Sequence, residues 1–318
     1  MRGTAIVAAS LAVVFGSVGL AVAATFSVVS SDDEGPGTLR AAIVLANAEP
    51  RSTIVLDLSP DEQILLKTSL PALQARGTVV EGRGATLRQA AECQRPQGRR
   101  GCDGLVVRGA EITVRDLRIV GFLLDGVAVL GSGAKNVRIE RLHAVDNMDD
   151  GVGVSGGAGP VLVTDCVLMG NGYRTKGKGL LVFSDASATL TNSVVVANRD
   201  GVTVTRGSKV TLEDVFVVGN YDKGVGASAG EVVARRTSVV ANGQASQEGK
   251  AAPNGDGVRL GLRSSAKLSD CFISGNGDGG VVVLDSSRVR LLRCSIENNG
   301  GDATVVAPEA TLTLESPR

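Results

Sequence analysis

The chain has 318 residues, and its 33 Lys and Arg residues balance its 33 Asp and Glu residues, so its formal net charge is zero. Because a nucleic-acid binder needs a basic excess to displace counterions, this balance argues against that class of protein. Apolar residues make up 43% of the chain, which excludes a disordered protein, and the absence of Trp with only 3% aromatic residues excludes a core of large rings. Many short Val-rich runs broken by Gly and Asn are typical of strands and turns.

Residues 1–24 are predicted to be a secretory signal peptide, and residues 25–318 the mature domain. Arg2 supplies the positive start, an apolar stretch follows from Ala5 to Val22, and Ala21-Val22-Ala23 is a small-x-small cleavage site. The alternative is a retained membrane anchor, because the apolar stretch is nearly long enough to span a bilayer. With the signal removed no second apolar span remains, so we expect a secreted or periplasmic protein without a membrane span.

The next segment is predicted to cap the fold. Residues 38–46 have helical spacing, with Thr38 as the N-cap, and we assign residues 25–48 to an N-terminal cap. Strands are expected at Thr53–Leu58 and at Gly77–Val80. A short helix here would cover the open end of a stack of strands.

The five cysteines fall into two groups. Cys93 and Cys102 flank a turn-rich segment and are the natural disulfide pair. Cys166, Cys271 and Cys294 occupy one position of the repeat described next, where we expect small, buried and inert thiols. Cys271 and Cys294 would lie on adjacent coils, whereas Cys166 is four coils away. No Cys/His spacing typical of zinc is present, and the only His is His143.

From residue 104 onward the chain repeats with a period near 23 residues. A Gly followed by an apolar residue restarts each unit, and an Asn recurs five residues after a fixed apolar or small position. The restart glycines are Gly104, Gly126, Gly151, Gly179, Gly201, Gly224, Gly257 and Gly280, and the Asn column is Asn147, Asn171, Asn198, Asn220, Asn242, Asn276 and Asn299, with Phe122 in the first unit. This pattern predicts a solenoid whose coils stack like strands in parallel, with the Asn side chains bonded in a ladder.

Two coils carry an insertion between the ladder Asn and the restart Gly, and both insertions leave the same corner. Long loops on one face of a repeat array often wall a binding groove. An aromatic residue among Arg and Lys side chains suits an anionic sugar chain, because rings stack on sugars and guanidinium groups grip carboxylates. Ordinary solvated turns are the alternative for these residues. The predicted substrate-binding residues are Tyr173, Arg174, Lys176, Asp200, Tyr221 and Asp222, and the candidate bases or clamps are Lys178, Arg199 and Lys223.

The residue before each restart Gly forms a second column that is rich in Asp. Stacked carboxylates repel, so Asp125 and Asp150 are expected to show raised pKa values or to hold a cation. Asp149 adds a third carboxylate, which makes Asp149 and Asp150 a candidate Ca²⁺ site. Turn formation by Asp-Gly is the alternative explanation.

Four segments resemble the opening of pectate lyases, and the later coils resemble the wider right-handed parallel β-helix family. These segments are Gly35-Pro36-Gly37-Thr38-Leu39-Arg40-Ala41-Ala42-Ile43, Ile54-Val55-Leu56, Val79-Val80-Glu81-Gly82-Arg83-Gly84-Ala85 and Ile112-Thr113-Val114-Arg115-Asp116-Leu117-Arg118-Ile119. The resemblance covers nearly the whole mature chain and implies an all-β fold, a single-stranded right-handed parallel β-helix with a short N-terminal capping helix.

The resemblance also implies β-elimination on uronate polymers, but the lyase motifs are incomplete in this chain. The family's Ile-Asp-His aligns with Ile139-Glu140-Arg141, and the second Asp of its Asp-Gly-Leu-x-Asp aligns with Val154. We therefore expect a protein that binds an acidic polysaccharide or cell-envelope glycan and leave open whether it cleaves it. The alternative is a non-catalytic β-helix scaffold or adhesin-like envelope protein.

Overall fold

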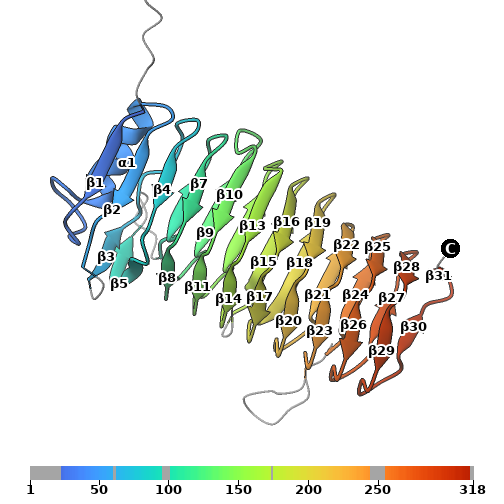
Figure 1. Cartoon of the computed structure of the whole chain (residues 1–318). Coiled ribbons are helices and arrows are strands. Elements are labelled where there is room, and N and C mark those ends of the chain that lie inside the picture. Colours follow the sequence, from blue (N-terminus) through green and yellow to red (C-terminus); the bar gives the residue numbers. More distant parts are fainter. Residues whose placement is uncertain (1–22, 60–61, 95–100, 173–174, 244–254, 316–318) are drawn as a thin grey trace, which may run out of the picture.

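In the computed structural model, residues 23–59, 62–94, 101–172, 175–243 and 255–315 are described. They form a right-handed solenoid of parallel strands with about 11 turns (Figure 1). The all-β fold class that the repeat predicts is confirmed. The predicted signal peptide lies outside the described residues except for Ala23 and Ala24, so the boundary at residue 24 stays a prediction.

The strands form three long parallel sheets, which we call A, B and C, and from β4 to β30 each coil contributes in turn to A, B and C. Sheet A contains β1 (Thr25–Val28), β2 (Thr53–Leu56), β4 (Val79–Glu81), β7 (Thr113–Arg115), β10 (Val137–Glu140), β13 (Val161–Thr164), β16 (Ser187–Thr191), β19 (Lys209–Glu213), β22 (Glu231–Arg235), β25 (Ser265–Ser269), β28 (Arg288–Leu292) and β31 (Thr311–Glu315). Sheet B contains β3 (Gln63–Thr68), β5 (Thr86–Gln94), β8 (Arg118–Val120), β11 (His143–Val145), β14 (Val167–Met169), β17 (Val194–Val196), β20 (Phe216–Val218), β23 (Ser238–Val240), β26 (Phe272–Ser274) and β29 (Ser295–Glu297). Sheet C contains β6 (Leu105–Val107), β9 (Val127–Leu130), β12 (Val152–Ser155), β15 (Lys178–Phe183), β18 (Asp200–Thr205), β21 (Val225–Ser228), β24 (Val258–Gly261), β27 (Val281–Val283) and β30 (Thr304–Val306).

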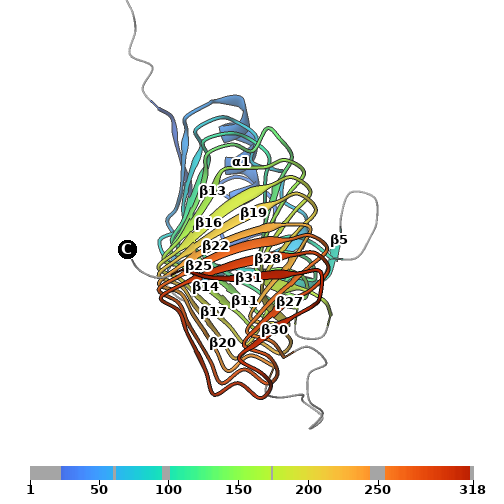
Figure 2. The same cartoon turned by 90° about the vertical axis from the view of Figure 1, so that its right-hand side faces the viewer.

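Alternate residues of each strand point into the solenoid and stack on their equivalents in the next coil. In β13, Val161 and Val163 are buried, and they pair in register with Ala188 and Leu190 of β16. Because Val, Leu, Ile and Ala fill these inward positions, the core needs no large ring, which agrees with the composition. The turned view shows the coils nested behind one another (Figure 2).

The single helix of the described residues, α1 (Leu39–Ala48), covers the N-terminal end. Thr38 is its N-cap, and the Thr38 hydroxyl accepts a hydrogen bond from the Ala41 N–H. Leu39, Ala42 and Ile43 are buried beneath it against the first coils. The predicted N-cap is therefore confirmed, and the helix extends two residues beyond the predicted end.

The seven Asn residues of the repeat form a continuous ladder between sheets B and C. Each Asn before Asn299 donates through Nδ2 to the Oδ1 of the next, at 2.8–3.0 Å, and each Oδ1 also accepts the backbone N–H of the preceding ladder residue. The first unit, which has Phe122 in place of Asn, joins through its backbone N–H to Asn147 Oδ1 at 3.0 Å. Buried turn backbone is thus satisfied by a column of amides.

The other repeat position that carries cysteine lies at the corner between sheets A and B. Cys166 and Cys271 are buried there and Cys294 is half-buried. Burial raises the pKa of the Cys166 thiol to about 12, which agrees with the inert role expected for it. Cys93 and Cys102, outside the repeat, are joined by a disulfide with Cα atoms 6.0 Å apart.

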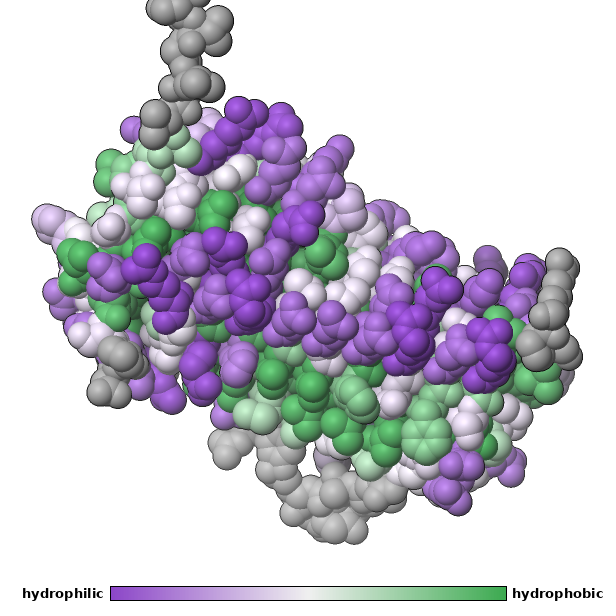
Figure 3. Space-filling model, viewed as in Figure 1, coloured by the Kyte–Doolittle hydropathy of each residue, from purple (hydrophilic) through white to green (hydrophobic). Residues whose placement is uncertain are grey.

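The outer face of sheet B is apolar. Phe216, Phe272 and Met169 are 59%, 40% and 39% exposed, and an apolar band crosses the lower part of the space-filling view (Figure 3). A face of this kind offers few polar groups to a sugar chain.

Candidate functional site

The Asp column before the restart glycines tethers neighbouring coils along the edge of sheet C. Asp103 Oδ1 accepts the Asp125 N–H at 3.2 Å, and Asp125 Oδ1 accepts the Asp150 N–H at 3.0 Å. Asp150 Oδ1 in turn accepts the Lys178 N–H at 2.7 Å. These bonds give the column a structural role in the turns, as the sequence alternative proposed, while the outer carboxylate oxygens still face the sheet C side.

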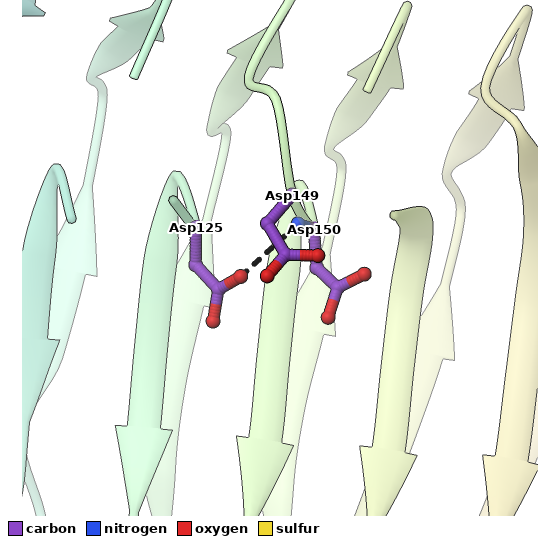
Figure 4. Close-up of side chains that lie close together, drawn as sticks. All are labelled: Asp125, Asp149 and Asp150. Carbon is purple, nitrogen blue, oxygen red and sulfur yellow. Dashed lines mark hydrogen bonds between the residues drawn. The ribbon is translucent and has the colours of Figure 1, made fainter. Parts of the chain in front are cut away.

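At the N-terminal part of this edge three carboxyl groups converge. One oxygen from each of Asp125, Asp149 and Asp150 lies within 4.8 Å of the others (Figure 4). Burial, together with the negative charges of Asp150 and Asp103, raises the pKa of Asp125 well above its usual value. Burial and the charge of Asp149 raise the pKa of Asp150 to about 7. The raised pKa values expected from the sequence are therefore confirmed for Asp125 and Asp150.

These carboxylates have the chemistry of a hard-cation site. Ca²⁺ takes oxygen ligands, and a cation would relieve the repulsion that raises the two pKa values. Asp125 is a third carboxylate beside Asp149 and Asp150, the two residues that the sequence predicted as a Ca²⁺ site. Two oxygens of the cluster already accept backbone N–H groups, so the free oxygens are the ones suited to a metal.

Further along the same edge, two adjacent coils bring five predicted residues together. The Arg199 guanidinium lies over the Tyr221 ring, 4.8 Å from its centroid. Lys223 Nζ lies 3.1 Å from Asp200 Oδ2 and 3.5 Å from Asp222 Oδ2. Burial raises the pKa of Asp222, although the Lys223 charge opposes that rise.

The Lys223 side chain extends over the outer face of sheet C, because residue 226 is Gly. A Cβ atom at Gly226 would lie 2.6 Å from Lys223 Cε and 2.8 Å from Lys223 Cδ. Gly153 has the same role further up the sheet, where a Cβ atom would lie 2.5 Å from Asp125 Oδ2. A missing side chain on the outer face therefore makes room for a charged group from the edge in both places.

Lys223 reaches an open cleft of about 270 Å³ on sheet C. Thr203, Gly226 and Arg259 pair in register across β18, β21 and β24 and form its floor. Its lining residues are Thr203, Lys223, Gly226, Ala227, Ser228, Arg259, Gly261, Leu262, Leu284 and Asp285. Arg259 Nη1 donates to Asp256 Oδ2 at 2.6 Å, and the guanidinium N–H groups that make no hydrogen bond within the described residues remain for a ligand.

Three buried oxygen atoms at and beside this cleft have no hydrogen-bond partner among the described residues. They are Thr203 Oγ1, Asp200 Oδ1 and Asp222 Oδ1, on side chains of residues that are 7–8% exposed. A buried polar atom without a partner costs about 1–3 kcal/mol, so such atoms are expected to meet water or a ligand group.

Several predicted residues do not join the cleft. Tyr173 and Arg174 lie outside the described residues, as does most of the second insertion. Lys176 is exposed, and Lys178 Nζ donates to the Lys176 carbonyl oxygen on its own loop. His143 is in β11 of sheet B, away from the cleft on sheet C.

Thr203, Gly226 and Arg259 were not among the site residues predicted from the sequence. Each lies two residues after a restart Gly and directly after a buried Val, so each lies on the outward side of the alternation. A sequence signal could have found them, because each is a polar, charged or Gly residue at an outward position that is apolar in the flanking coils. The apolar residues at that position are Leu181, which pairs with Thr203, and Val282, which pairs with Arg259.

The repeat region of the chain matches the model of a known protein family. Residues 99–237 and 232–316 match the family model described as a right handed beta helix region. No curated protein matches the chain.

Solved structures share the fold at low sequence identity. The A-module of mannuronan C-5 epimerase AlgE6 from Azotobacter vinelandii is 19% identical, with a TM-score of 0.66, over 90% of this chain and 79% of that one. A mutant of the periplasmic alginate epimerase AlgG is 13% identical, with a TM-score of 0.56, over 84% and 76% of the two chains. Tailspike protein 2 of an Escherichia coli O157:H7 bacteriophage is 10% identical, with a TM-score of 0.59, over 86% of this chain and 39% of that one.

Within the described part of the chain, no helix has the length and apolar character needed to cross a bilayer.

Proposed function

Because the chain belongs to the right-handed β-helix family, we propose that it binds an acidic polysaccharide on the outer face of sheet C, in the periplasm or outside the cell. Two of the similar structures are named as epimerases of mannuronan or alginate, and one of them is named as periplasmic. The signal-like residues 1–24 agree with export.

The observation that carries the proposal is the pairing of cationic donors with unpartnered oxygens in one cleft. Lys223 and Arg259 line the cleft and have N–H groups to spare, while Thr203 Oγ1 has no partner among the described residues. A uronate unit presents a carboxylate and several hydroxyl groups. The carboxylate would accept from Lys223 or Arg259, and the hydroxyl groups would satisfy the Thr203 and Asp200 oxygens.

The corner beside the cleft supports the same class of ligand. The Arg199 guanidinium lies over the Tyr221 ring, and Tyr221 is half-buried, so a partly exposed aromatic residue and a cation lie together. In this proposal Arg199, Tyr221 and Lys223 bind the polymer, with Asp200 and Asp222 holding the Lys223 ammonium in place.

Processing of the polymer is a second candidate, and the carboxylate cluster favours it. In β-elimination a base removes the C5 proton of a uronate, the C4–O4 bond breaks, a C4–C5 double bond forms and the leaving oxygen takes a proton. Asp125, Asp149 and Asp150 would hold Ca²⁺, which supplies neutralisation of the uronate carboxylate and so acidifies the adjacent C–H. Lys178, which lies in the column directly after Asp150, is the candidate base nearest to that cluster in register.

The test is retention of the protein by alginate and pectate in affinity electrophoresis, compared with neutral dextran. We expect Lys223→Met to weaken binding to both uronate polymers by about tenfold or more, since a hydrogen bond to a charged group contributes about 1.5–3 kcal/mol. The matched control is Lys209→Met, because Lys209 forms an exposed pair with Glu231 on sheet A, 2.7 Å apart. Equal retention by dextran, or unchanged retention of Lys223→Met, would count against an acidic ligand at this cleft.

Absorbance of unsaturated uronate products in the same mixtures, with and without Ca²⁺, separates binding from cleavage. Retention without product supports a binding protein, and product formation supports the second candidate. An envelope scaffold that uses another face predicts neither retention nor product.

A second variant tests the cleft without removing a charge. We expect Gly226→Val to abolish retention on alginate and pectate, because the new side chain displaces the Lys223 side chain and fills the cleft floor. The three atoms nearest to the new Cβ all belong to the flexible Lys223 side chain and not to the backbone, so far-UV circular dichroism should match that of the parent chain. Thr211→Val, on the outer face of sheet A, is the control and should leave retention unchanged; loss of retention there too would assign the effect to the fold.

A further inference from the structure

Two of the repeat cysteines occupy the same corner of adjacent coils near the C-terminal end. The residues that flank them pair in register, Ser269 with Leu292 and Phe272 with Ser295. The Ser295 N–H donates to the Cys271 carbonyl at 3.0 Å, which ties the two corners directly together. Cys271 therefore lies one coil below Cys294.

The backbone bends alike at both corners, so the two thiols point the same way. The residues before them have φ values of +54° at Asp270 and +51° at Arg293. Each Sγ also approaches the carbonyl oxygen two residues earlier, Ser269 for Cys271 and Leu292 for Cys294. The two side chains are therefore placed alike on their corners, and they are close enough for a hydrogen bond between the two sulfur atoms.

We propose that Cys271 and Cys294 form a second disulfide, which joins the last coils of the solenoid and opens and closes by exchange with solvent thiols and disulfides. Stacked strands are about 4.8 Å apart, and disulfides join Cα atoms about 4.4–6.8 Å apart, so the corners need little movement. Cys166 is the internal contrast, because Leu142 and Ser193 are its neighbours in the column and neither has a thiol.

The step is a thiol–disulfide exchange with an external disulfide as oxidant. Cys294, which is half-buried, loses its proton and attacks one sulfur of the oxidant, forming a mixed disulfide and releasing one thiolate. The Cys271 thiol then loses its proton, attacks Cys294 Sγ and releases the second thiolate. Two electrons pass from the cysteine pair to the oxidant, and two protons leave the protein.

The electrostatics of the pair favour this order. The hydrogen bond from Cys271 lowers the pKa of Cys294 to about 6, whereas the same interaction and burial raise the pKa of Cys271. Cys294 is then the thiolate at neutral pH, and it is also the thiol that solvent can reach.

The disulfide would lie next to the poorly buried strands at the C-terminal end of the described solenoid. Beyond the Cys294 corner lie β29, β30 and β31, whose residues are exposed or half-buried. A covalent link between these two coils holds the coil that carries β28 and β29 onto the one that carries β25 and β26. This inference rests on the coil geometry alone and stands or falls separately from the proposed polysaccharide binding.

The test uses the full folded chain, incubated with oxidised glutathione, quenched in acid, denatured, alkylated with iodoacetamide and digested with trypsin without reductant. The three thiols fall in different tryptic peptides: Cys166 in 142–174, Cys271 in 268–288 and Cys294 in 294–318. We expect peptides 268–288 and 294–318 to be recovered as one cross-linked species and Cys166 to be the only alkylated cysteine. Recovery of Cys271 and Cys294 both alkylated, or both as separate glutathione adducts, would overturn the proposal.

Three further measurements separate a functional disulfide from an incidental cross-link. Titration with dithiothreitol should open Cys271–Cys294 before Cys93–Cys102, because Cys93 and Cys102 are at most 1% exposed. The variant Cys294→Ser should leave Cys271 alkylated after denaturation, and hydrogen exchange in β29 and β31 of the oxidised parent should be slower than in this variant. Equal exchange rates in oxidised parent and variant would show that the bond does not hold the end coils.

Discussion

Asn220→Ala is expected to lower the free energy of unfolding by about 3–6 kcal/mol, the largest loss that we expect from a single side chain here. Asn220 Oδ1 accepts from Asn198 N at 2.9 Å and from Asn198 Nδ2 at 3.0 Å. Its Nδ2 donates to Asn242 Oδ1 at 2.9 Å and to the Val195 carbonyl at 3.2 Å. Truncation leaves the Asn198 backbone N–H without its acceptor and removes one partner each from Asn198 Nδ2, Asn242 Oδ1 and the Val195 carbonyl. These groups lie at the centre of the ladder, where the three Asn residues are at most 1% exposed.

The measurement is urea denaturation followed by far-UV circular dichroism, since the chain has no Trp for fluorescence. The control is Asn192→Gly, because Asn192 is exposed and has a φ of +47° that Gly adopts freely. We expect that variant to stay within about 0.5 kcal/mol of the parent. If Asn220→Ala and Asn192→Gly cost the same, the ladder contributes no more than an ordinary turn residue.

Asp150→Asn is expected to stabilise the protein above neutral pH, in contrast to most substitutions of buried polar residues. The pKa of Asp150 is raised to about 7 by burial and by Asp149, so folding takes up a proton between the unfolded pKa near 3.9 and about 7. The free energy of unfolding therefore falls as pH rises through this range. The amide keeps an oxygen to accept the Lys178 N–H and removes the buried charge.

The gain should be on the order of 2–4 kcal/mol near pH 8 and should vanish near pH 4, where the parent carboxyl is already neutral. Thermal denaturation at both pH values measures it. Asp165→Asn, at an exposed corner position, is the matched control and should show no gain at either pH. A gain of equal size at pH 4 and pH 8 would exclude the buried charge as its cause.

The same variant tests the proposed cation site. We expect Ca²⁺ to raise the melting temperature of the parent at pH 8, because a cation between Asp125, Asp149 and Asp150 offsets their mutual repulsion. Asp150→Asn should lose most of this response and Asp165→Asn should keep it. A response that is equal in all three proteins would place any bound Ca²⁺ elsewhere.

The repeat was predictable because the solenoid turns spacing along the chain into position in space. Asn171, Asn198 and Asn220 are 27 and 22 residues apart in sequence, yet they stack directly on one another. Once the ladder Asn residues of two coils are aligned in sequence, the strand residues of those coils are aligned in register as well. The carboxylates Asp125 and Asp150 were brought together for the same reason, and the charge of Asp150 adds to burial in raising the pKa of Asp125.

The cleft was not predictable in the same way, because it depends on which side chains leave the edge and lie over the sheet. Lys178 and Lys223 both precede a restart Gly and belong to one column. Lys178 remains at the edge and bonds to the Lys176 carbonyl, whereas Lys223 lies across Gly226 and lines the cleft. The position that matches Gly226 in the coil of Lys178 is Leu181, whose side chain occupies the corresponding space.

The amino-acid sequence by itself determined the period, the Asn ladder, the capping helix and the stacking of the Asp column. Each of these depends on residues that recur at one spacing or lie next to each other along the chain. Only the tertiary structure decided that Thr203, Lys223 and Arg259 share a cleft and that the Lys223 side chain lies across Gly226. Those outcomes depend on the volume and direction of neighbouring side chains on different coils, which the spacing of the repeat does not specify.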